Sequence, residues 1–228
     1  MATYVLIPPA GNGPWYWQPL EAELRDKGHE VVVVDLPCDD DSAGLAEYTD
    51  VAVKAIGDRT DLVVVAQSFG AYTGALVCDR VPADLLVLLT PMVPAPGESP
   101  GEWWGSSGYP QARQAQAERN GWTPEQDQDP NLIFFNDLSP ELVEASAENA
   151  REQSGTPFEK PWPLDAWPNV PTRALICRDD HFFPVDFLRQ LVKDRIGITA
   201  DEMGGGHPVA LSRPKELADQ LEALRLKA

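Results

Sequence analysis

Short apolar runs rich in β-branched residues alternate along this chain with longer segments of helical periodicity. Six such runs are candidate strands, at residues 3–7, 30–35, 62–66, 85–89, 172–177 and 198–203. Several are unbroken, such as the four valines at residues 31–34, and this is typical of strands buried on both faces. Strands that alternate with helices form βαβ units, in which the strands are parallel. The sequence therefore predicts an α/β fold, with a mostly parallel sheet of about six strands and helices on both faces.

Candidate helices lie between these runs. Residues 17–27 and 45–56 are amphipathic, and each is followed by a glycine suited to the left-handed position that ends a helix, Gly28 or Gly57. A further helix is expected to begin at residue 68 or 69 and to run through Asp79.

The segment at residues 94–168 interrupts the alternation. It is rich in Pro, Gly, Gln and Trp, and it has helical periodicity only near residues 111–120 and 140–153. We expect a helical cap inserted over the carboxyl edge of the sheet, with residues 1–93 and 169–228 forming a single core. A disordered or purely structural insertion is the alternative, and the aromatic residues of the segment argue against disorder. These aromatics are Trp103, Trp104, Trp122, Phe134, Phe135, Trp162 and Trp167.

Ser68 stands where the strand at residues 62–66 passes into a helix, within Ala66-Gln67-Ser68-Phe69-Gly70. A sharp strand-to-helix turn exposes a serine hydroxyl but strains its backbone, so small residues are needed two positions before and after it. Ala66 and Gly70 supply them, although the usual pattern has glycine at the first position. We therefore predict that Ser68 is a catalytic nucleophile, which requires a base nearby.

The base is expected to be His207, because it lies in a glycine-rich loop after the last strand and before the last helix. Pro208 disfavours the α-region for His207 and keeps it in that loop. Of the other two histidines, His29 precedes a strand and is expected to be a solvated surface residue at the opposite edge of the sheet. His181 is expected to line the pocket or the surface.

The acid that orients His207 should follow the strand at residues 172–177. Asp179 and Asp180 are both candidates there, and a carboxylate at that point can accept the Nδ1 proton of the base. We favour Asp180, because Asp180-His181-Phe182-Phe183-Pro184 has the DxxxP spacing found after the acid in many hydrolases of the α/β type. The order Ser68, Asp180, His207 is also the order of that type.

Two backbone N–H groups are expected to form an oxyanion hole. One belongs to Phe69, directly after the nucleophile. The other should come from the loop after the first strand, where Ala10 is the first residue after Pro8 and Pro9 that still has an N–H. Residues expected from their position to contact substrate are Pro9, Met92, Trp104, Phe134 and His181.

Residues 6–17, Leu-Ile-Pro-Pro-Ala-Gly-Asn-Gly-Pro-Trp-Tyr-Trp, look like the plant methylesterase and hydroxynitrile-lyase group, whose members carry His-Gly-Ala-Cys-His-Gly-x-Trp-x-Trp here. Together with Asp35-Leu36-Pro37 and Gly206-His207, they make the chain resemble the α/β-hydrolase superfamily over nearly its whole length. The resemblance implies an α/β-hydrolase core and places Ala10 at the oxyanion-donor position. The chain departs from the group at Pro8-Pro9, which replaces His-Gly.

Charge and cysteine content limit the expected partners. The chain has 36 acidic and 18 basic residues and a net charge of −18, so we expect no nucleic-acid and no membrane partner. Three widely spaced cysteines fit neither a disulfide framework nor a zinc site, and they are expected to be buried thiols. The first residues do not resemble a signal peptide, and no apolar stretch approaches the roughly 20 residues of a membrane span. We expect a soluble, cytoplasmic protein with no metal and no cofactor, and a homodimer is left open.

Three functions remain as alternatives. The first is hydrolysis of a small apolar or aromatic ester, thioester or lactone through an acyl-enzyme on Ser68. The second is lyase or cyclase chemistry with the same residues and no acyl-enzyme. Hydroxynitrile lyases of the resembling group have a Thr in the oxyanion loop and a Lys after the base, where this chain has Pro9 and Pro208, so cyanohydrin cleavage is disfavoured. The third is a non-catalytic binding protein on the same scaffold, which the intact set of catalytic residues disfavours.

Overall fold

A six-stranded sheet forms the centre of the molecule in the computed structural model, which describes residues 1–227. The strands follow the order β2-β1-β3-β4-β5-β6, and every neighbouring pair is parallel. They are β1 (Thr3–Ile7), β2 (Glu30–Val33), β3 (Leu62–Gln67), β4 (Leu85–Leu89), β5 (Thr172–Cys177) and β6 (Asp201–Met203). The predicted α/β fold with about six parallel strands is therefore confirmed.

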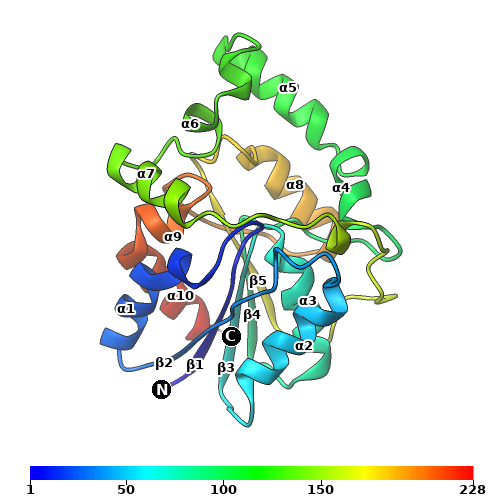
Figure 1. The fold of residues 1–228 in the computed structure, drawn as a ribbon, viewed down its shortest axis with the longest axis vertical. Helices are drawn as coiled ribbons and strands as arrows, with labels where there is room; N and C mark the ends of the chain where they lie inside the picture. Colours follow the sequence, from blue (N-terminus) through cyan, green and yellow to red (C-terminus); the bar gives the residue numbers. More distant parts are fainter. Residues whose placement is uncertain (228) are drawn as a thin grey trace.

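Helices cover both faces of the sheet (Figure 1). One face carries η1 (Pro14–Trp17), α1 (Gln18–Asp26), α9 (Val209–Ser212) and α10 (Pro214–Arg225), and the other carries α2 (Leu45–Ile56), α3 (Gly70–Arg80) and α8 (Val185–Ile196). Successive side chains of β3 enter opposite cores, with Val64 facing α2 and α3, and Val63 and Val65 facing α1 and α10. Both cores exclude water, which accounts for the unbroken apolar strands.

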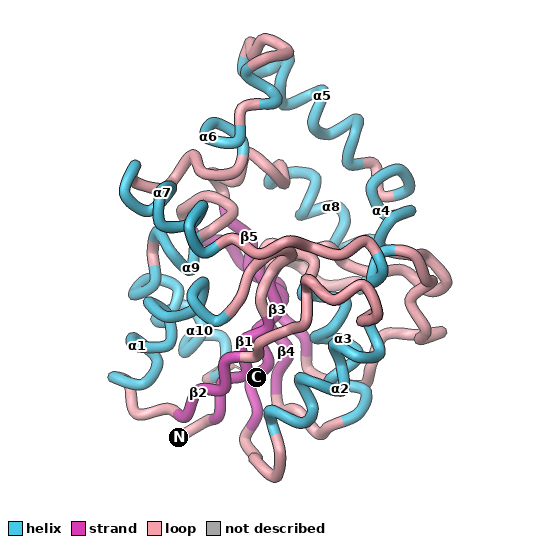
Figure 2. Tube along the Cα trace, viewed as in Figure 1, coloured by secondary structure: helices cyan, strands magenta, loops and turns pink. Residues whose placement is uncertain are grey.

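The elements between β4 and β5 lie over the carboxyl ends of the strands (Figure 1). They are α4 (Pro100–Ser106), α5 (Tyr109–Asn120), η2 (Gln126–Gln128), α6 (Pro130–Ile133), α7 (Pro140–Asn149) and η3 (Thr156–Phe158). Ser99 and Ser139 each cap a helix of this group, because their hydroxyls accept a backbone N–H of the first turn. After α7 the chain continues as a loop across the strand ends (Figure 2).

Some expected bounds differ from those observed. The strand expected at 30–35 ends at Val33, and the strand expected at 198–203 begins only at Asp201. The helix expected at 140–153 ends at Asn149, and the Arg151 N–H that follows donates to the Gly11 carbonyl oxygen in the loop after β1. Helix α8 was not expected, although four of its apolar residues have the spacing of one helix face. These residues are Phe187, Leu188, Leu191 and Val192.

All three cysteines, Cys38, Cys78 and Cys177, are buried free thiols, as predicted. Burial raises the pKa of the Cys78 thiol to about 12. Within residues 1–227, every helix is too short or too polar to cross a bilayer.

Candidate active site

Ser68 occupies a strained turn between β3 and α3. Its φ of +52° lies in the left-handed region, which non-glycine residues seldom adopt and which costs of order 1–3 kcal/mol. Two residues later, a Cβ added at Gly70 would lie 2.6 Å from the carbonyl oxygen of Pro8. Only glycine allows the start of α3 to approach the loop after β1 this closely, and the turn therefore presents Ser68 at the carboxyl edge of the sheet.

Ala66, which stands where the usual motif has its first glycine, is accommodated by a glycine on α3. A Cβ added at Gly74 would lie 2.5 Å from the Cβ of Ala66. Ala66 on β3 carries a methyl group at this crossing and Gly74 on α3 carries none, so β3 and α3 can pack closely.

His207 contacts the carboxylate of Asp180. The His207 Nδ1 to Asp180 Oδ2 distance is 2.8 Å, and both side chains are buried. The other carboxylate oxygen, Oδ1, accepts the backbone N–H groups of Phe182 and Phe183, each at 2.8 Å. Asp179 makes a different contact, since its Oδ2 accepts the Gly205 N–H at 2.9 Å. Of the two candidate acids, Asp180 is therefore the one that can hold the imidazole in a single tautomer and stabilise its cation.

The other ring nitrogen of His207, Nε2, is buried and has no hydrogen-bond partner among residues 1–227. Ser68 and His207 line the same cavity. Without substrate, the hydrogen bond between a nucleophile and its base is often long and tightens only in the complex. His207, whose Nε2 has no partner within residues 1–227, and Ser68 thus lie at one cavity.

The two expected oxyanion donors are both available. Neither the Ala10 N–H nor the Phe69 N–H donates to an acceptor in the part of the chain that the structure describes. Ala10, Phe69 and Ser68 line one cavity.

The cavity beside Ser68 has a volume of about 120 Å³ and a mostly apolar wall. Pockets for drug-sized ligands are larger, at about 300–1,000 Å³. Its lining residues are Pro9, Ala10, Ser68, Phe69, Met92, Trp104, Phe134, Phe158, Phe182 and His207. The structure thus brings four of the five expected substrate contacts to the nucleophile. Sequence reasoning missed Phe158 and Phe182.

His181 is the expected contact that does not reach this cavity. Its Nδ1 lies 2.8 Å from the carbonyl oxygen of Leu132, and its ring packs against Trp122 of the cap. The neighbouring Phe182 points to His207 instead, with ring centroids 5.0 Å apart. The loop after Asp180 thus turns His181 toward the cap and away from the cavity beside Ser68.

His29 also differs from expectation. It lies before β2, at the opposite edge of the sheet from the cavity, but its side chain is only 5% exposed. Its Nδ1 accepts the Ala2 N–H at 3.1 Å, and its Nε2 lies 3.2 Å from a carboxylate oxygen of Glu222. The expectation of a solvated surface residue is wrong, because the last helix covers the ring.

The segment between β4 and β5 contacts both loops that carry Asp180 and His207. The Asn136 amide donates to the carbonyl oxygen of Asp179 at 2.8 Å, and the carboxylate of Asp137 accepts the Gly206 N–H at 3.2 Å. Burial alone would raise the pKa of Asp137, but hydrogen bonds, chiefly from Arg213, outweigh burial and lower it. No spacing in the sequence signals these contacts.

Gln67, next to Ser68 in the sequence, binds the backbone of His207. Gln67 is fully buried, and its Nε2 donates to the carbonyl oxygen of His207 at 2.7 Å. Its position beside Ser68 in the motif is a signal that sequence reasoning did not use.

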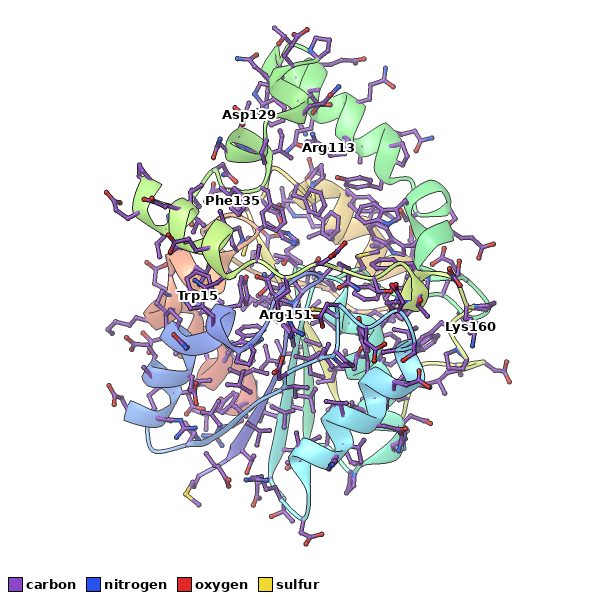
Figure 3. The ribbon with its side chains drawn as sticks, in the orientation of Figure 1. Trp15, Arg113, Asp129, Phe135, Arg151 and Lys160 are labelled. Carbon is purple, nitrogen blue, oxygen red and sulfur yellow. The ribbon has the colours of Figure 1, made fainter. Side chains whose placement is uncertain are left out.

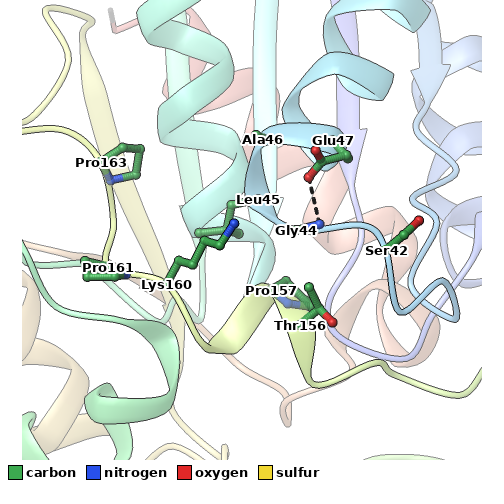
Figure 4. Close-up of a pocket in the computed structure, with 10 residues that line it drawn as sticks. All are labelled: Ser42, Gly44, Leu45, Ala46, Glu47, Thr156, Pro157, Lys160, Pro161 and Pro163. Atoms are coloured by element: carbon green, nitrogen blue, oxygen red, sulfur yellow. Dashed lines mark hydrogen bonds between the residues drawn. The ribbon is translucent and has the colours of Figure 1, made fainter.

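A second pocket, of about 220 Å³, lies on the surface between α2 and the segment after η3 (Figure 4). The hydrogen bond drawn there joins the Gly44 N–H to Glu47 and caps α2. Lys160 and three prolines form the other side. This pocket shares no residue with the cavity beside Ser68.

Known proteins of similar sequence and fold match nearly the whole chain. The chain is 23% identical to norfluorocurarine synthase 1 of Strychnos sp, over 97% of this chain and 94% of that protein. It is 24% identical to the alpha-hydroxynitrile lyase of Arabidopsis thaliana, over 97% of this chain and 96% of that protein. The crystal structure of polyneuridine aldehyde esterase has the same fold, with a TM-score of 0.80 and 19% identity over 98% of this chain and 99% of that chain.

The resemblance to a group that contains both esterases and hydroxynitrile lyases is therefore confirmed. The model of the alpha/beta hydrolase family matches residues 4–220, nearly the whole chain. With the sheet topology and the turn at Ser68 in agreement, this chain belongs to the alpha/beta hydrolase family.

Proposed function

We propose that this chain is a serine hydrolase that cleaves small, uncharged carboxylic esters, or the corresponding thioesters or lactones. One observation carries the proposal. His207 is bound to Asp180 through Nδ1 at 2.8 Å, while its Nε2 is unoccupied beside a serine in a strained turn. A binding protein has no need of that strain, and a nucleophile does.

In this mechanism His207 Nε2 takes the proton of Ser68 as Oγ attacks the carbonyl carbon of the substrate. The N–H groups of Ala10 and Phe69 donate to the oxygen that becomes negative, a contribution of about 2.7–4 kcal/mol per donor. His207 then gives its proton to the leaving alkoxide, which leaves an acyl group on Ser68. Water, deprotonated by His207, attacks this acyl group, and Ser68 recovers its proton as the acid departs.

The lining of the cavity supports a neutral and compact substrate. No Asp, Glu, Lys or Arg is among the described residues that line it, so nothing there would compensate a charged acyl group. Five of the ten residues that line it are aromatic residues from the core and the cap, namely Phe69, Trp104, Phe134, Phe158 and Phe182. Apolar or small aromatic acyl groups fit this chemistry.

Intact-mass spectrometry after treatment with a fluorophosphonate tests the nucleophile, and hydrolysis of p-nitrophenyl esters from acetate to octanoate tests the reaction. We expect a single adduct on Ser68 and turnover that depends on chain length. Ser68→Ala should form no adduct, and its turnover should be at least about 10³-fold slower. Its melting temperature should be unchanged, because the hydroxyl serves the reaction and not packing. Substantial activity in this variant would contradict the mechanism.

Lyase or cyclase chemistry is the second candidate, because relatives that match nearly the full chain are named as a lyase and a synthase. Pro9 and Pro208 stand where the resembling hydroxynitrile lyases have Thr and Lys, so we do not extend cyanohydrin cleavage to this chain. Labelling of Ser68 without turnover of any ester in the series would favour this second candidate.

A further inference from the structure

The cap also contacts the loop that carries Ala10. After α7, residues 151–153 cross this loop, and Figure 3 labels Arg151 where the chain passes over the strand ends. The Arg151 N–H donates to the carbonyl oxygen of Gly11 at 2.9 Å. The Gly11 N–H in turn donates to Oε1 of Gln153 at 3.0 Å. Both backbone polar groups of Gly11 are thus bound by the cap.

Residues 151–153 are themselves fixed to the core. The Arg151 guanidinium donates to Asp35 at 2.7 Å, to Asp39 at 2.6 Å and to the carbonyl oxygen of Leu36 at 3.1 Å. All three acceptors follow β2. The contacts of Arg151 with two carboxylates restrain residues 151–153.

The amide of Gln153 is held on its other side as well. Its Nε2 donates to the Tyr48 hydroxyl on α2 at 3.1 Å and to the carbonyl oxygen of Ser154 at 3.0 Å. With Nε2 bound in this way, Oε1 is left facing Gly11. An acceptor in a defined position is what the Gly11 N–H requires.

These contacts fix the peptide that follows Ala10. The ring of Pro9 restricts the backbone on one side of Ala10. On the other side, the Ala10–Gly11 peptide is bound at both ends, by Asn12 Nδ2 on the carbonyl oxygen at 2.8 Å and by Gln153 on the N–H. Gly11 has φ +67°, and an added Cβ would lie 3.1 Å from the carbonyl oxygen of Arg151. The N–H of Ala10 is the donor that remains unbound.

We infer that Gln153 is a positioning residue for the oxyanion hole, acting through Gly11 to aim the Ala10 N–H at the cavity. The inference rests on the proposed function and goes beyond it, because it gives the cap a part in transition-state stabilisation as well as in substrate fit. A hydrogen-bond donor must be aimed at the developing oxyanion to contribute fully, so a loosened loop should lower kcat more than it raises KM.

The test compares Gln153→Met with Gln114→Met, a matched change at an exposed cap residue whose side chain donates a hydrogen bond to Glu118. Each variant is assayed on an ester and on its thionoester, whose sulfur is a poor hydrogen-bond acceptor. For Gln153→Met we expect kcat on the ester to fall about 10- to 100-fold, with KM within about twofold and a lower ester-to-thionoester rate ratio. Gln114→Met should match the wild type in kcat on the ester, in KM and in the ester-to-thionoester rate ratio.

A second readout needs no turnover. Amide hydrogen exchange at Gly11 should be about tenfold faster in Gln153→Met, because its acceptor is gone. Gln153→Glu keeps an acceptor oxygen at the same chain length but loses the Nε2 donor to Tyr48 and Ser154, so it should restore slow exchange and the rate ratio only in part. If Gln153→Met does not fold, Asn12→Ala tests the same peptide from its carbonyl side, with the same expected fall in the ratio.

The outcomes separate this inference from the proposed function. Wild-type turnover with an unchanged rate ratio in Gln153→Met and Asn12→Ala would overturn the inference alone. Absence of both a Ser68 adduct and turnover in the wild-type protein would overturn the proposed function and this inference with it.

Discussion

At the scale of single residues, the adjacent carboxylates of Asp179 and Asp180 serve different partners. Asp180 contacts the imidazole of His207, whereas Asp179 accepts the backbone N–H of Gly205. An asparagine amide can still accept a hydrogen bond from Gly205, but it cannot stabilise an imidazolium or hold the same tautomer of the base.

We therefore expect Asp180→Asn to lower kcat by about 10³–10⁴-fold and Asp179→Asn by less than about tenfold. Steady-state kinetics on the best p-nitrophenyl ester, with melting temperatures to verify folding, measure the difference. Equal losses of kcat in the two variants, or a larger loss in Asp179→Asn, would show that the orienting role does not belong to Asp180 alone.

At the scale of elements, the crossing of β3 and α3 requires one methyl group and no more. Ala66 supplies it, and a Cβ on Gly74 would lie 2.5 Å from it. Gly74→Ala gains up to about 1 kcal/mol of helix propensity, but overpacking costs about 1–3 kcal/mol. We expect a net loss of stability in Gly74→Ala and recovery in Gly74→Ala with Ala66→Gly, which moves the methyl group from the strand to the helix.

Denaturant unfolding of the two single variants and the double variant measures this exchange. Because the residues are in contact, their effects should not add, and the double variant should be more stable than Gly74→Ala. Additive losses would show that the motif tolerates alanine at position 66 for another reason.

Helix α4 contributes Trp104 to the cavity wall, and this residue offers a test of the size limit. In a cavity of about 120 Å³, we expect turnover of the wild type to fall steeply between butyrate and octanoate esters. Trp104→Ala enlarges the cavity and should shift the preference toward longer chains. Trp122→Ala, the same change at a cap residue that packs on His181, should leave the preference unchanged. A shift in both variants would indicate general loosening of the cap.

At the scale of the whole molecule, Glu222 joins the first strand to the last helix. Its carboxylate accepts the Tyr4 hydroxyl at 2.6 Å and the Arg225 guanidinium at 2.8 Å, and it lies beside His29. The hydrogen bond from Arg225 is the main cause that lowers the pKa of Glu222 from about 4.5 to about 2, and Tyr4 adds to it.

Because this pKa is lower in the folded state, the stabilisation is fully present above about pH 4.5 and is lost as the pH falls toward 2. The loss amounts to at most about 3 kcal/mol. We expect Glu222→Gln to be less stable than the wild type at pH 7 and to lose less stability between pH 5 and 2. Unfolding free energies across that range measure it, with Glu216→Gln on the exposed side of α10 as control. Parallel pH profiles of unfolding free energy for Glu222→Gln and the wild type would refute the stabilising role of the Glu222 carboxylate.

Periodicity and motif order determined the core of this protein. The expected bounds of β1, β4, β5 and α2 are those observed, because each is set by local hydrophobic patterning and by glycine at the end of the helix. Parallel strands present their carboxyl ends at one edge of the sheet, and this is why residues as distant as Ser68 and His207 could be expected at one cavity.

Only the tertiary structure decided the positions of side chains that depend on contacts between segments distant in the sequence. Contacts with the cap bring Phe158 and Phe182 to the cavity and turn His181 away from it. Contact with the last helix buries His29. The hydrogen bond between Gly11 and Gln153 joins residues 142 positions apart. Local propensity carries no information about such pairings, because their energy comes from groups that meet only after the sheet and the cap have assembled.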